Sequence, residues 1–172
     1  MKSLIASIAI VGLVGLAIGT GAGAAEVTAT VTPQNIAVSL SASTVSYGVL
    51  DLSTSDGDRV TAFSGTFTAT NDSNVLANFT IKGTDTNNGW TLNFSPADVG
   101  TVAADQFVHR FDANTVFGDG TAKALSTSVQ TLGSAIPVNG TQDFVLQMNM
   151  PTASANAAAE QSSTVTVVAS AP

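Results

Sequence analysis

Apolar side chains recur at every second position along most of the chain, with serine or threonine between many of them. In one such run, Phe79 and Ile81 alternate with Thr80 and Lys82. A period of two puts successive side chains on opposite faces of an extended strand, whereas an amphipathic helix needs a period near 3.6. The pattern therefore predicts strands with one apolar face and one polar face.

The same alternation recurs from one end of the chain to the other. It covers residues 27–31, 36–42, 63–69, 75–81, 90–94, 144–150 and 165–169. Less regular strands are expected at 45–52, 106–112 and 124–132, and Asn, Asp and Gly residues between the runs supply turns. We therefore expect an all-β fold, a single antiparallel immunoglobulin-like β-sandwich of about 9–10 strands over residues 26–172.

The first 25 residues have the pattern of a signal peptide. Lys2 precedes an apolar run at 4–18, and Ala22 and Ala24 provide the small residues that a signal peptidase needs. This segment predicts a hydrophobic signal helix at 1–25 and a secreted or cell-surface protein. An uncleaved membrane anchor is the alternative, because residues 3–25 carry no charge and 15–19 form a GxxxG motif.

The composition removes several classes of protein. Cys is absent, so neither a disulfide framework nor a cysteine-ligated metal site is possible. The 12 acidic and 5 basic side chains give a net charge of −7, which disfavours nucleic acid as a partner because phosphates require clustered Lys and Arg. We therefore expect stability outside the cell to come from packing.

The residues required for catalysis are scarce. His109 is the single histidine, and it shares its strand face with Phe107 and Phe111, which favours a structural role. The two glutamates, Glu26 and Glu160, lie near the termini rather than as a facing pair. We expect a protein that is not an enzyme and that requires no cofactor.

Calcium is the one metal for which the sequence offers ligands. Asp112, Asn114 and Asp119 bring oxygen atoms into a single loop, and calcium prefers such ligands. The spacing does not match an EF-hand, and Asp and Asn in loops commonly cap their own backbone. Capping is the favoured interpretation, and calcium binding is the alternative.

The aromatic residues allow a sugar-binding surface, and the Asn-x-Ser/Thr sequons allow glycosylation. Tyr47, Trp90 and Phe107 would form a sugar-stacking platform if they were exposed, but the alternation of Trp90 with Leu92 favours a place in the core. Asn-x-Ser/Thr sequons begin at Asn71, Asn78, Asn93 and Asn139, and such sequons mark surface positions in exported glycoproteins.

Several short tracts resemble known surface proteins. The tracts at 45–50 (VSYGVL), 68–74 (TATNDSN), 79–83 (FTIKG) and 90–92 (WTL) are similar to short secreted Ser/Thr-rich β-sandwich surface proteins of small-genome bacteria, which have no assigned activity. The tract NGWTL at 88–92 also resembles the first motif of WxL cell-wall-binding domains. The second Trp-x-Leu motif of that family is missing from the C-terminus, which reads TVTVVASAP at 164–172.

The leading hypothesis is a non-catalytic exported protein of the cell surface or envelope with a structural, adhesive or interaction role. A second hypothesis is a filament or surface-layer subunit, in which residues 26–32 complete the sheet of another copy and Pro33 ends the pairing. The favoured alternative is that 26–32 form the first strand of their own sandwich. A carbohydrate- or calcium-binding module is the third hypothesis. Expected partners are the envelope or further copies of the chain, with membrane contact through an uncleaved leader.

Overall fold

The computed structural model describes residues 28–54, 60–94, 103–118 and 120–172. This part of the chain contains strands and no helix, which confirms the all-β expectation. The expected leader at 1–25 lies outside the described residues. The chain divides into a unit at 1–32 and a unit at 33–172.

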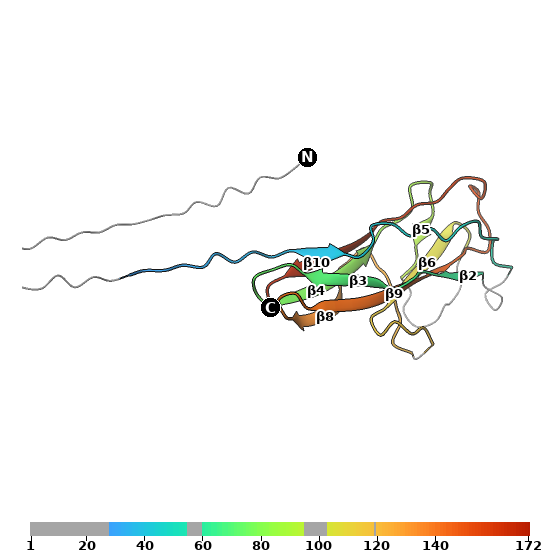
Figure 1. The fold of residues 1–172 in the computed structure, drawn as a ribbon. Helices are drawn as coiled ribbons and strands as arrows, with labels where there is room; N and C mark the ends of the chain where they lie inside the picture. The colour runs from blue at the N-terminus through green and yellow to red at the C-terminus, as the bar shows by residue number, and fades with distance from the viewer. Residues whose placement is uncertain (1–27, 55–59, 95–102, 119) are drawn as a thin grey trace, which may run out of the picture. The chain divides into compact units, whose positions relative to one another are not determined.

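Ten strands form in the described residues, joined into two sheets (Figure 1). They are β1 (Val38–Leu40), β2 (Thr61–Phe63), β3 (Phe67–Asn71), β4 (Ala77–Gly83), β5 (Thr91–Leu92), β6 (Gln106–Asp112), β7 (Lys123–Ala124), β8 (Gln130–Ile136), β9 (Thr141–Asn149) and β10 (Val165–Ser170). The seven-stranded sheet has the order β1-β3-β9-β6-β5, with β2 also paired to β9 and β7 to β6. The three-stranded sheet has the order β10-β4-β8.

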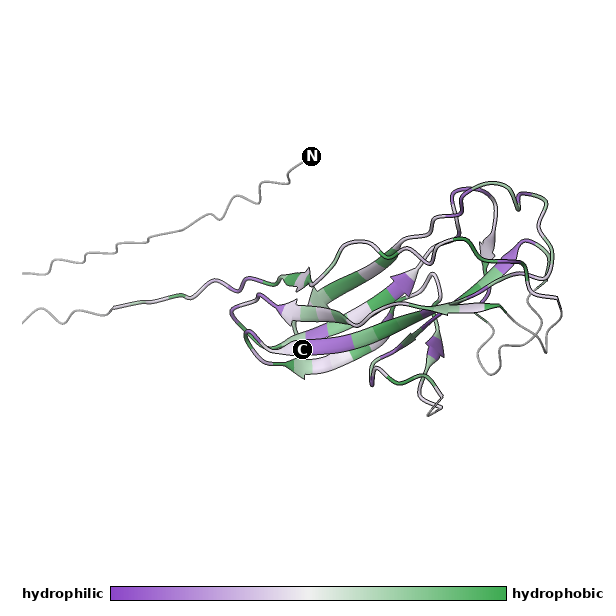
Figure 2. Ribbon diagram, turned by 45° about the vertical axis from the view of Figure 1, so that its right-hand side comes forward, coloured by the Kyte–Doolittle hydropathy of each residue, from purple (hydrophilic) through white to green (hydrophobic). Residues whose placement is uncertain are grey.

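A common apolar core joins the two sheets. Phe67 and Phe144 come from the seven-stranded sheet, Phe79 and Leu132 from the three-stranded one, and all four belong to one buried cluster. Phe67 and Phe144 stack with their ring centroids 5.4 Å apart. Each fully buried side chain of this size contributes about 1.5–3 kcal/mol. Hydrophobic and hydrophilic residues succeed one another along the strands in Figure 2, as the alternation predicts.

An irregularity between β2 and β3 reverses one expected orientation. Both strands pair with β9, but Phe63 lies opposite Gln147 and Phe67 opposite Phe144. Four residue steps on one strand thus match three on the other, as in a β-bulge, and the extra residue turns the following side chains to the other face. Phe63 is consequently 57% exposed although it has the parity of buried Phe67, so the expectation of a common inner face at 63–69 is wrong.

Other departures concern pairing and strand length. β5 pairs with β6 in parallel, so the sandwich is not wholly antiparallel. No strand forms at 45–52, and the strand expected at 124–132 is split between β7 and β8. By contrast, the strand expected at 106–112 coincides with β6.

Residues 28–37, which precede β1, are not part of a sheet. Residues 28–32 form no strand and are exposed, so the expected first strand at 26–32 is wrong for these five residues; 26 and 27 lie outside the described residues. The following residues are tied to the turn after β3. The Asn74 main-chain N–H donates to the carbonyl of Asn35, the Asn35 N–H donates to Asn74 Oδ1, and the Asn74 side-chain amide donates to the carbonyl of Pro33.

Candidate functional site

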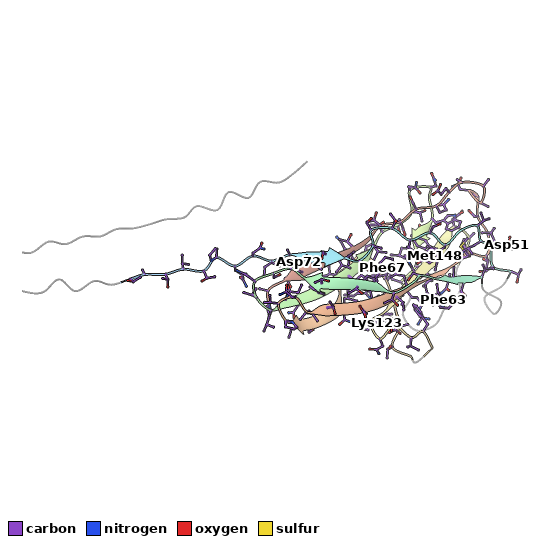
Figure 3. All side chains as sticks on the ribbon, viewed as in Figure 1. Asp51, Phe63, Phe67, Asp72, Lys123 and Met148 are labelled. Atoms are coloured by element: carbon purple, nitrogen blue, oxygen red, sulfur yellow. The ribbon has the colours of Figure 1, made fainter. Side chains whose placement is uncertain are left out.

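A groove of about 800 Å³ opens between the three-stranded sheet and the segment that follows β1. Its floor is apolar and comes from β3 and β9, where Phe67 and Met148 are labelled in Figure 3. Val165 and Val167 of β10 form one wall. The remaining walls are formed by residues 42–50 and 157–164.

The strand lengths explain why the groove is open. β1 and β10 are edge strands of the two sheets and lie close together. β1 ends at Leu40 after three residues, whereas β10 continues for six. The chain keeps one further main-chain hydrogen bond to β3, from Ser41 to Thr68, and then forms no strand up to residue 54, so it leaves the edge of the seven-stranded sheet there. The Val165–Val167 half of β10 therefore faces the groove, and no strand in the described part of the chain pairs with its outer edge.

Tyr47 and His109 connect one wall of the groove to β6. The Tyr47 hydroxyl lies 2.8 Å from His109 Nε2, and the two atoms share a hydrogen bond whose donor is set by the imidazole tautomer. Burial lowers the pKa of His109 to about 4 and raises the pKa of Tyr47 above its ordinary range. Among the described residues, the hydrogen-bond partner of this histidine is thus a phenol rather than the serine of a hydrolytic triad.

Trp90 and Phe107 belong to the core. Trp90 is 5% exposed, its ring centroid lies 6.5 Å from that of Phe107, and its indole N–H donates to Ser154 Oγ over 2.7 Å. Phe107 is fully buried. Neither side chain presents an open ring face of the kind that stacks on a sugar, and the core position that the alternation predicts for Trp90 is confirmed.

The loop proposed for calcium uses its oxygen atoms internally. Asp112 is buried, its Oδ1 accepts the main-chain N–H of Asn114, and its Oδ2 accepts the Thr121 hydroxyl. The Asn114 amide also donates to Thr121. Asp119 lies outside the described residues. The contacts of Asp112 and Asn114 are those of a capped turn.

One sequon contains a structural asparagine. Asn71 is fully buried, and its amide nitrogen donates to three main-chain carbonyls, those of Val75, Ile136 and Pro137. Its Oδ1 accepts the N–H of Ser73. A glycan on this nitrogen would displace these bonds, so the folded chain does not offer Asn71 for modification.

Within the described residues, no three His, Asp or Glu side chains are placed to share a metal ion. The same part of the chain holds no helix with the length and hydropathy to cross a membrane. No protein-family model matches the chain, and no similar curated protein or solved structure was found.

Proposed function

We propose that the chain is a non-catalytic exported protein of the cell surface or envelope, and that it acts as a subunit of an extracellular filament or surface layer. The observation that carries this proposal is the state of residues 28–32. Their sequence alternates Ala29 and Val31 with threonines, as in a half-buried strand, yet all five residues are exposed and Val31 is 89% exposed.

A segment with a strand pattern and no sheet of its own is suited to complete another sheet. In strand addition, main-chain hydrogen bonds hold an extended peptide to a free sheet edge, and alternate side chains enter pockets beside it. Pro33 follows the segment directly and has no N–H for a ladder, which sets the end of such pairing. Repetition from copy to copy would produce an open polymer.

The proposal includes an exported location and an immunoglobulin-like arrangement of the two sheets. The pattern at 1–25 supports export. The absence of Cys agrees with an exported domain whose stability comes from packing rather than from disulfide bonds. The Tyr47–His109 pair supports a non-catalytic role, because burial lowers the pKa of His109 to about 4 and so makes its imidazole a weak general base near neutral pH. Intact mass of the exported protein tests the location: a loss of about 25 residues is expected, and an unprocessed, cell-internal chain would contradict it.

Light scattering tests the assembly. The full chain should form polymers, and Val31→Asp should abolish them because a charge would enter an apolar site. The matched control is Thr30→Asp, which puts the same charge on the opposite face of the segment, where polymerisation should survive. Both positions are exposed, so neither variant should alter the fold. A full chain that stays monomeric over the whole concentration range would contradict the proposal.

A further inference from the structure

We infer that the outer edge of β10, with the groove beside it, is the acceptor for residues 27–32 of a second copy of this chain. The inference rests on the proposed function and names the surface through which it operates. A donor strand needs an unpaired main-chain edge and an apolar recess for its alternate side chains. The Val165–Val167 half of β10 provides both.

β10 differs from the other sheet edges in the described residues. β1 and β5, at the ends of the seven-stranded order, contain three and two residues. β8, the other edge of the three-stranded sheet, has register shifts against β4 and a positive φ of 53° at Ala135. β10 instead pairs with β4 over six consecutive residues without a shift. Irregular or very short edges resist further pairing, so β10 is the edge best able to accept a strand.

The sequence of β10 lacks the features that protect an edge from pairing. It reads VTVVAS, with no charge, proline or glycine. Natural edge strands are commonly blocked by lysine, proline or a bulge, because an unprotected edge pairs with other chains. An unprotected regular edge of this kind is therefore expected to have a partner.

Donor and acceptor match in length and pattern. Residues 27–32 read VTATVT, and β10 likewise contains six residues, so each spans about 20 Å. Apolar residues occupy alternate positions in the donor, and Val165, Val167 and Ala169 pack toward the core at alternate positions in β10. Pairing in register would continue the apolar inner face of the three-stranded sheet.

The groove also suits an uncharged strand. Glu160 is the only ionised side chain among its described lining residues, because burial keeps His109 neutral. Leu40 and Val45 border it with more than a third of their surface exposed, and Val49 is fully exposed. Apolar donor side chains would cover part of this surface, at about 25 cal/mol per Å² removed from water.

The donor segment is attached at one end of the sandwich and the groove lies at the other, which favours pairing with a neighbouring copy over pairing within the same chain. Pro33–Ala37 are fixed beside the turn at 72–74, which follows the end of β3. The Ser170 end of β10, where Ser170 pairs with Asn78, lies at this same end of the sandwich. The groove lies at the Val165 end of β10. The donor thus leaves from one end, and the acceptor opens toward the other. A head-to-tail contact of this type generates filaments when its rotation does not close a ring.

Paired cysteines in this cysteine-free chain test the acceptor directly. The full chain carrying Ala29→Cys and Val167→Cys is treated with a short bismaleimide and run on a denaturing gel. Position 29 lies midway among the donor's apolar residues and 167 midway among those of β10, so the two lie opposite each other in either strand direction. The matched control is Ala29→Cys with Thr131→Cys, which places the second cysteine on β8.

A ladder of covalent multimers from the first pair, with little cross-linking in the control, is the expected result. A ladder from the β8 control alone would overturn the β10 assignment and leave strand donation standing. A cross-linked monomer from the first pair would show that the segment folds back on its own chain and would overturn the inference. Polymers that form by light scattering but give no ladder with either pair would also overturn it, without removing the proposed function.

Discussion

Protonation of His109 should make the sandwich less stable in acid. The side chain is 3% exposed, and burial lowers its pKa to about 4, whereas an unfolded histidine titrates near 6.5. Between these values the unfolded state binds more protons than the folded state. The free energy of unfolding therefore falls as the pH drops from 6.5 toward 4, and the contribution of the neutral imidazole is fully present above pH 6.5.

The size of the effect follows from the two pKa values. The gap between about 6.5 and about 4 corresponds to about 3 kcal/mol once the histidine is protonated in both states. Between pH 7 and pH 4.5, about 2 kcal/mol of this should be lost.

Urea denaturation at the two pH values measures the effect, with the fluorescence of Trp90, the single buried tryptophan, as the probe. The comparison variant is His109→Gln, which stays neutral at both pH values and retains an oxygen acceptor for Tyr47. Carboxylates elsewhere contribute equally to both proteins and cancel in the difference. The variant should lose about 2 kcal/mol less than the wild type between pH 7 and pH 4.5. Equal losses, within about 0.5 kcal/mol, would refute the argument that a buried neutral histidine governs this pH dependence.

Three further substitutions test the packing and the turns by urea denaturation. Phe79→Ala should lower the free energy of unfolding by about 3–5 kcal/mol by opening a core cavity, and a loss below about 1 kcal/mol would contradict its central position. Asn71→Asp should lower the free energy of unfolding by about 2–3 kcal/mol, because a carboxylate cannot donate hydrogen bonds to the three carbonyls that accept from the Asn71 amide. An unchanged free energy of unfolding would rule out this donor role. Asp112→Ala should lower the free energy of unfolding by about 1–3 kcal/mol, because Asn114 and Thr121 lose their hydrogen-bond acceptor. The loss should be the same in calcium and in chelator, and a wild-type Tm that rises with calcium would instead support a metal site.

The alternation predicted the strands whose inner face is continuous. In β4 the buried residues Ala77, Phe79 and Ile81 follow the expected period of two. The strand expected at 106–112 coincides with β6, and His109 is buried as its parity with Phe107 indicated. Local periodicity suffices in such strands because a single face carries most of the apolar surface.

The same rule failed where non-local pairing changes which face is inside. β9 lies between β3 and β6, and both of its faces are partly covered. Phe144 and Leu146 are therefore buried on one face of β9, and Val145 and Asn149 are buried on the other. Phe94 has the parity of Leu92 but lies beyond the end of β5, and it is exposed. Neither outcome is encoded in the spacing of apolar residues along one strand.

The candidate site was only partly predictable. The alternation and Pro33 identified 26–32 as a possible donor, and the uncharged VTVVAS tract is a signal that could have marked β10 as an unprotected edge. The groove gave no comparable signal, because its walls come from segments more than a hundred residues apart, at 42–50 and 157–165.

The sequence by itself determined the extended backbone, the hydroxyl-rich outer faces, the absence of cysteine and the presence of a single histidine. These are properties of residue type and of a period of two, and they need no knowledge of distant contacts. Only the tertiary structure decided that β1 stops at Leu40, that no strand of the described residues pairs with the outer edge of β10, and that Tyr47 reaches His109. Each of these depends on which strands become neighbours, and a strand edge stays free or is paired according to contacts made far away along the chain.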